Sequence, residues 1–84
     1  MPSKERLALE GAIVRLKYKI ATLRLKIKGA AALIRNDLAV YKMMHLEQID
    51  AEQLRANYEI IATSLAELRP LEAELEELKA EAEP

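Results

Sequence analysis

The side chains that could support catalysis are few in this sequence, and they gather around its single histidine. His45 lies close to Glu47 and Asp50, and imidazole is the side chain that exchanges protons near neutral pH. The sequence has no cysteine, and its two serines, Ser3 and Ser64, lie far from His45 along the chain. Because no nucleophile accompanies a base, the pattern predicts a structural histidine near the end of a helix, no catalytic residues and no enzyme.

The other chemistries with recognisable spacing are also missing. No Glu-x-x-His pair occurs, although a di-metal site in a helical bundle needs such pairs facing inward. Gly11 and Gly29 stand alone inside helical patterns, so no glycine-rich phosphate loop is present. We therefore expect neither a metal nor a cofactor.

The strongest local signal is the stretch RLKYKIATLRLKIK, residues 15–28, in which cations alternate with apolar residues. Its cations could follow the phosphates of a nucleic acid or an anionic surface, with affinity that falls steeply with salt. On a helix, however, they divide between two edges, and no recognition helix or aromatic stacking platform accompanies them. Nucleic acid is thus the less favoured partner, and an anion-binding role is the alternative function. The six candidate residues are Arg15, Lys17, Lys19, Arg24, Lys26 and Lys28.

The same stretch is helical rather than extended. Its apolar residues change parity at Ala21-Thr22 without the turn chemistry of a β-hairpin. At about 100° per residue, they instead form two apolar stripes on nearly opposite sides of a helix. This helix is predicted to lie between two helical neighbours.

Composition and charge favour a single all-α domain over residues 1–84. Ala, Glu, Lys, Leu and Arg make up 53 of the 84 residues, as in long helices and coiled coils. Residues 1–42 carry ten Lys or Arg and three acids, a net charge of +7, whereas residues 43–84 carry three Lys or Arg and eleven acids, a net charge of −8. These opposite charges predict that the two halves meet. No apolar run is long enough to span a membrane or to act as a signal peptide, so a cytoplasmic protein is expected.

Start and stop signals divide the chain into two helices. Ser3 is the expected N-cap of a helix over about 3–47, followed by a turn over about 48–50. Asp50 and Gln53 form a capping box for a second helix over about 51–82, with a kink near Pro70. A continuous helix through residues 48 and 49 is the alternative, but it would place polar residues in the seam.

The apolar ladders of the two segments predict an antiparallel, coiled-coil-like hairpin. In the predicted pairing, Leu16 lies opposite Ala82 and Ile20 lies opposite Leu78. The alternating three-and-four spacing of each ladder is interrupted once, near Gly29 in the first and near Pro70 in the second. The predicted seam consists of Leu16, Ile20, Leu23, Ile27, Ile34, Leu38, Tyr41, Tyr58, Ile61, Leu65, Leu68, Leu71, Leu75 and Leu78.

The second apolar stripe predicts self-association. Leu7, Val14, Tyr18 and Leu25 lie outside the seam, and residues 7–14 are expected to extend beyond the end of the second helix. Soluble monomers seldom expose such a stripe, so a homodimer forming a four-helix bundle is favoured. Fraying of residues 1–12 and docking on a larger protein partner are the alternatives. The expected function is structural, as a scaffold or adaptor that acts through protein–protein interaction.

Overall fold

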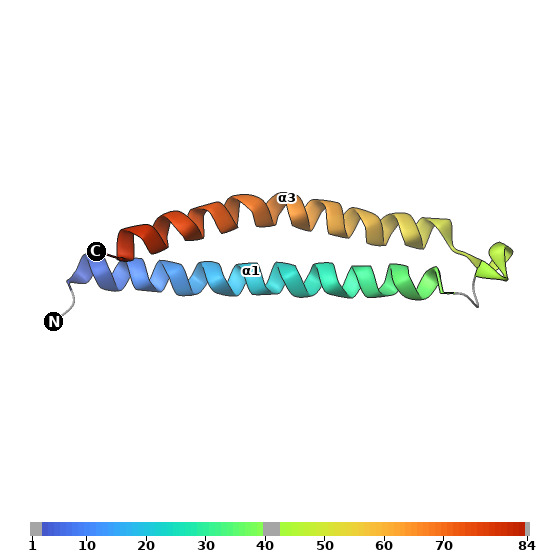
Figure 1. Cartoon of the computed structure of the whole chain (residues 1–84), viewed down its shortest axis with the longest axis horizontal. Coiled ribbons are helices and arrows are strands. Elements are labelled where there is room, and N and C mark those ends of the chain that lie inside the picture. The colour runs from blue at the N-terminus through green and yellow to red at the C-terminus, as the bar shows by residue number, and fades with distance from the viewer. Residues whose placement is uncertain (1–2, 40–42, 84) are drawn as a thin grey trace.

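Two long antiparallel helices form the protein. The computed structural model describes residues 3–39 and 43–83, and within them it contains α1 (Lys4–Asp37), the short 3-10 helix η1 (Leu46–Gln48) and α3 (Ala51–Ala82). The helices lie side by side, and the two chain ends lie at the same end of the molecule (Figure 1). The rod measures 64 × 18 × 16 Å. The all-α helical hairpin predicted from the sequence is confirmed.

Both helices begin at the predicted caps. The Ser3 side chain accepts a hydrogen bond from the Arg6 amide at 3.1 Å, and the Asp50 carboxylate accepts one from the Gln53 amide at 3.1 Å. Each bond satisfies an amide that has no partner within the first helical turn. α3 continues through Pro70 as one helix, and it is bowed along its length where α1 is nearly straight (Figure 1).

The first helix ends earlier than predicted. α1 stops at Asp37, about ten residues before the predicted end, and the amide of Leu38 donates to the carbonyls of Ile34 and Asn36. Asn36 and Asp37 occupy this end, and short polar side chains of this kind favour helix ends over helix interiors. The connection that follows is much longer than the predicted three-residue turn. Tyr41, a predicted seam residue, lies outside the described residues.

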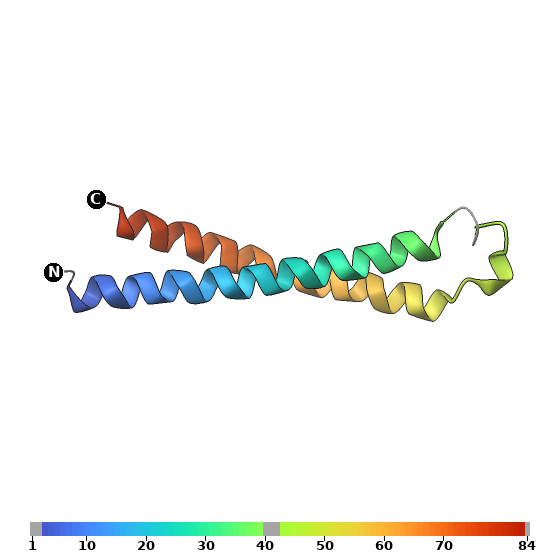
Figure 2. The same ribbon diagram turned by 90° about the horizontal axis from the view of Figure 1, so that it is seen from below.

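The core is a seam with regular heptad spacing. Leu16, Ile20, Leu68 and Leu75 are buried, and Ile13, Leu23, Ile27, Leu71 and Leu78 pack against them. The two helices cross as they run along the rod (Figure 2), as helices with a heptad seam do. Ile34 and Ile61 are half-buried at seam positions nearer the turn.

The seam near the turn differs from the predicted one. The structure buries Ala30, Asn57 and Ser64, whereas Leu38, Tyr58 and Leu65 are 48%, 66% and 36% exposed. Each of these exposed residues directly follows a seam position, because the three-and-four spacing of the core continues through both helices without a break. At these points the prediction assigned the large apolar residue to the seam. The helical period instead places the neighbouring small or polar residue there.

Candidate protein-binding surfaces

The outer face of α1 carries large apolar side chains that no other part of the described chain covers. Leu7, Val14, Tyr18 and Leu25 are 54%, 65%, 75% and 69% exposed. They lie outside the seam on α1 and extend over about 27 Å at 1.5 Å per residue. Tyr18 also borders a shallow groove with Glu67 and Leu71 of α3. We call these four residues the α1 outer stripe. They lie where the sequence placed them, as an apolar surface without an intramolecular partner.

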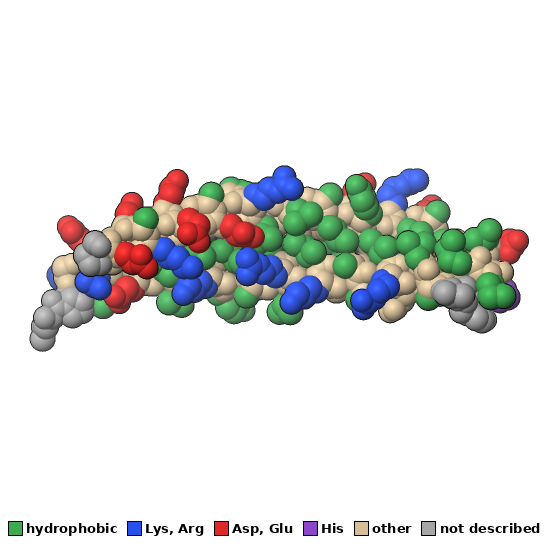
Figure 3. All heavy atoms as spheres, viewed as in Figure 1, with side chains coloured by type: hydrophobic (Ala, Val, Ile, Leu, Met, Phe, Trp, Pro, Cys, Tyr) green, Lys and Arg blue, Asp and Glu red, His purple; other side chains and the backbone are tan. Residues whose placement is uncertain are grey.

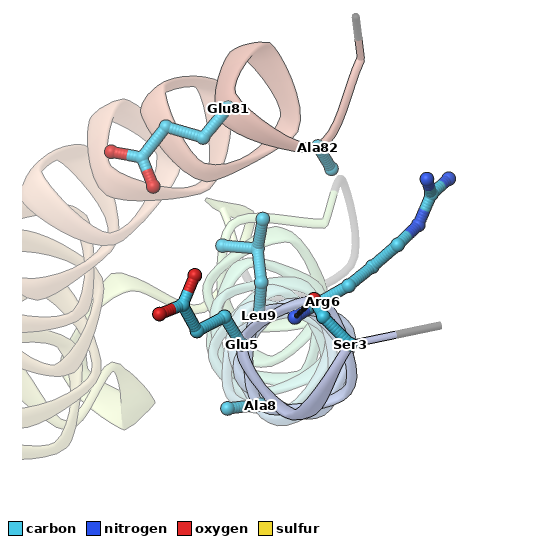
Figure 4. A pocket seen from close by; sticks show the side chains of 7 residues that line it. All are labelled: Ser3, Glu5, Arg6, Ala8, Leu9, Glu81 and Ala82. Atoms are coloured by element: carbon cyan, nitrogen blue, oxygen red, sulfur yellow. Dashed lines mark hydrogen bonds between the residues drawn. The ribbon is translucent and has the colours of Figure 1, made fainter. Parts of the chain in front are cut away.

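The beginning of α1 is covered by α3, contrary to the expectation for residues 7–14. Leu9 and Ala82 line a pocket at the open end of the hairpin, together with Ser3, Glu5, Arg6, Ala8 and Glu81. Figure 4 shows the Leu9 side chain pointing toward the end of α3. Ile13 packs against the core. The predicted pairing was wrong at this end, because Ala82 lies beside Leu9 rather than beside Leu16.

The same displacement is visible further along the rod. Ile20 and Leu75 line one groove, whereas the prediction placed Leu78 opposite Ile20. The helices are therefore paired one to two turns closer to the start of α1 than predicted. This follows from the early end of α1, which moves the turn toward the N-terminus. Both helices then cover each other over nearly their whole length.

The six cations of residues 15–28 are all exposed on α1. Arg24 pairs with Glu72 of α3 at 3.6 Å, which brings the basic and acidic segments together at one point. Between described residues, the other five cations of this stretch make no ion pair within 4.0 Å. Between described residues, the acids of α3 therefore neutralise only part of the positive charge of α1.

Polar groups lie in the core near the turn, and sequence reasoning missed them. Asn57 and Ser64 are each 2% exposed, and the side-chain nitrogen of Asn57 has no hydrogen-bond partner in the described structure. Their position was recoverable from the sequence, because both residues continue the heptad spacing of Leu68 and Leu75 back along α3. The prediction missed these two residues because it assigned the seam from apolar residues alone.

Within the described part of the chain, the side chains that could bind a metal do not cluster. His45 is exposed at the start of η1, and nowhere in residues 3–39 and 43–83 do three His, Asp or Glu side chains gather around a space for a metal ion. Across the same residues, neither long helix contains a stretch apolar enough to cross a membrane. Comparison with protein families, with curated proteins and with solved structures finds no match for this chain.

Proposed function

We propose that this protein acts without catalysis, by self-association and protein–protein interaction, in a scaffold or adaptor role. The observation that supports this proposal is the α1 outer stripe, whose four large side chains are each more than half exposed. Burying such a stripe against another helix stabilises the complex by about 25 cal/mol for each Å² of apolar surface removed from water. A second copy is the simplest partner.

The stripe suits antiparallel packing of two α1 helices. If Leu7 of one copy lies across from Leu25 of the other, Val14 lies across from Tyr18. Gly11 and Ala21 fall between these large side chains on the same face, and alternating large and small residues can interdigitate. The result is a four-helix assembly of two hairpins, with each hairpin contributing its first helix to the interface.

The test is a measurement of mass by light scattering or sedimentation. Replacing Val14 and Tyr18 with Asp should reduce the mass to that of one chain while the circular dichroism remains helical. A matched control places Asp at Ala66 and Ala73, which are exposed on α3, and it should leave the mass unchanged. An unchanged mass for the Val14 and Tyr18 variant, with intact helicity, would remove the stripe from the interface.

A second candidate function is binding of a nucleic acid or another anionic surface by residues 15–28. It is favoured by the five cations of this stretch that have no ion pair between described residues. Binding of a labelled DNA duplex and of anionic vesicles, each at low and near-physiological salt, tests it. Tight binding that weakens steeply with salt would support this function, because bound cations displace counterions. No binding at either salt concentration would exclude it.

A further inference from the structure

A second apolar surface lies on the half of the rod nearest the turn. Leu38, Tyr58 and Leu65 are 48%, 66% and 36% exposed there. Leu65 lies one heptad before Glu72 on the same edge of α3. Leu38, which caps the end of α1, lies two heptads after Arg24. Since Arg24 and Glu72 are paired, these apolar residues occupy the same face of the hairpin, toward the turn.

Cations border this surface on both helices. Lys28 and Arg35 line a shallow groove with Ala31 and Ala32 on α1. Arg55 precedes Tyr58 by one turn on α3, and Arg69 follows Leu65 by one turn. Figure 3 shows hydrophobic side chains filling the middle of this half, with Lys and Arg along both edges and some acidic side chains at the α3 edge. We call Leu38, Tyr58, Leu65 and these four cations the turn-half face.

The positive charge of the turn-half face exceeds that of the nearby acids, among which Glu52 and Glu59 lie one turn before and one turn after Arg55 on α3. Its four cations are exposed, and none makes an ion pair within 4.0 Å between described residues. Glu59 lines a different groove, together with Lys26 and Ile60. Glu72 stands at the border of the face, where Arg24 pairs with it. The surface is therefore apolar at its centre and positive at both margins.

A second copy does not complement this face. Two copies packed through it would be related by a two-fold axis. With the axis along the rod, Lys28 and Arg35 of one copy meet Arg55 and Arg69 of the other. With the axis across the rod at the middle of the face, Lys28 of one copy meets Arg35 of the other, and Arg55 meets Arg69. Both packings set cations against cations, which disfavours association.

We propose that the turn-half face binds an amphipathic helix of another protein whose apolar stripe is flanked by Asp and Glu. Such a helix would lie along the line between α1 and α3 and form a three-helix bundle over this half of the rod. Arg55 and Arg69 are about 21 Å apart along α3, which corresponds to about four turns of the partner. The acidic flanks would face Lys28 and Arg35 on one side and Arg55 and Arg69 on the other.

The probe is a synthetic amphipathic peptide of about 20 residues, about 30 Å long as a helix, with a leucine stripe and glutamate on both flanks. A second peptide carries lysine in place of each glutamate, and a third has the glutamate composition with its leucines dispersed around the helix. Fluorescence anisotropy at near-physiological salt measures binding to the full chain. We expect the glutamate peptide to bind, and the other two to bind about tenfold more weakly or worse.

Variants of the face make the test specific. Replacing Tyr58 and Leu65 with Asp should abolish binding while the circular dichroism stays helical. Replacing Arg55 and Arg69 with Glu should weaken binding of the glutamate peptide and strengthen binding of the lysine peptide. An unfolded variant would not bind the lysine peptide more strongly, so this exchange separates a charge effect from unfolding. The matched control, Lys19→Glu with Lys26→Glu, changes the net charge by the same amount at positions outside the face. It should change binding of the peptides little.

Three outcomes would overturn the proposal. One is failure of the glutamate peptide to bind, and another is equal binding of the peptide with dispersed leucines, which would indicate charge attraction alone. The third is a lower mass for the Tyr58 and Leu65 variant than for the wild type when no peptide is present, which would make a second copy the occupant. The Val14 and Tyr18 variant should still bind the peptide, so this result is separable from the test of self-association.

Discussion

Leu9 near the start of α1 and Ala82 at the last position of α3 line the same pocket at the open end of the hairpin. This shared pocket shows how the two helices are paired at the open end of the hairpin. A heptad seam can slide by whole heptads and still place apolar residues in the interface. The length of the connection after Asp37 decides between these pairings.

Cross-linking can test this pairing directly, because the chain has no cysteine of its own. Cysteines at Leu9 and Ala82 should be linked within one chain by a short bis-maleimide. Cysteines at Leu16 and Ala82 should be linked much less efficiently, since Leu16 lies about 10 Å further along α1 at 1.5 Å per residue. Denaturing electrophoresis followed by peptide mass analysis reads the result. Preferential linkage of the Leu16 pair would restore the pairing predicted from the sequence.

The fold class could be read from the sequence because it depends on features that repeat many times. Heptad spacing, the Ser3 and Asp50 caps and the opposite charges of the two halves each predict a hairpin of two helices. The pairing depends on one feature, the end of α1 at Asp37. The prediction missed this helix end because the apolar ladder continues through Leu38. Small and polar seam residues were hidden for the same reason: a hydrophobic pattern does not detect Ala30, Asn57 or Ser64.

The candidate surfaces were only partly predictable. The α1 outer stripe is visible in the sequence as a second apolar ladder that one partner helix cannot cover. The turn-half face is not, because the prediction assigned Leu38, Tyr58 and Leu65 to the seam. Once the seam passes through Asn57 and Ser64, these larger apolar residues are left at the surface. An error of one residue in the phase of a helix therefore exchanges a core residue for a surface one.

Asn57 should weaken the fold relative to an apolar residue at the same position. Its buried side-chain nitrogen has no partner, and an unsatisfied buried polar group costs about 1–3 kcal/mol. We expect Asn57→Leu to raise the free energy of unfolding by about 1 kcal/mol or more, and the melting temperature by about 4–8 °C per kcal/mol. Thermal and urea unfolding followed by circular dichroism measure this change.

Thr63→Leu is the control, because Thr63 is a polar residue exposed inside α3. It should shift stability by about 0.5 kcal/mol or less. All variants must be compared at one protein concentration, since association would itself raise the apparent stability. Lower stability for Asn57→Leu than for the wild type would mean that the site cannot accommodate a larger side chain, and the expectation would be wrong.

Pro70 should also lower stability, since it lies inside α3. Proline lacks the amide that would donate to the carbonyl four residues earlier, and its ring crowds that carbonyl. Pro70→Ala should therefore stabilise the hairpin by up to about 3 kcal/mol, less whatever strain the bow of α3 already relieves. Ala66→Pro, one turn away on the exposed side of the same helix, should destabilise it by a similar amount. Equal unfolding midpoints for Pro70→Ala and the wild type would show that the bowed helix accommodates proline at no cost.

The start of α3 depends on the Asp50 cap, whose carboxylate accepts the Gln53 amide at 3.1 Å. Asp50→Ala should lower the free energy of unfolding by about 1 kcal/mol, because the amide loses its acceptor at the helix end. Asp50→Asn is the control that keeps an acceptor oxygen at the same place, and it should retain most of the stability. Urea unfolding at one protein concentration compares the two variants. If Asn and Ala destabilise equally, the negative charge near the helix N-terminus, rather than the hydrogen bond, is the stabilising contribution of Asp50.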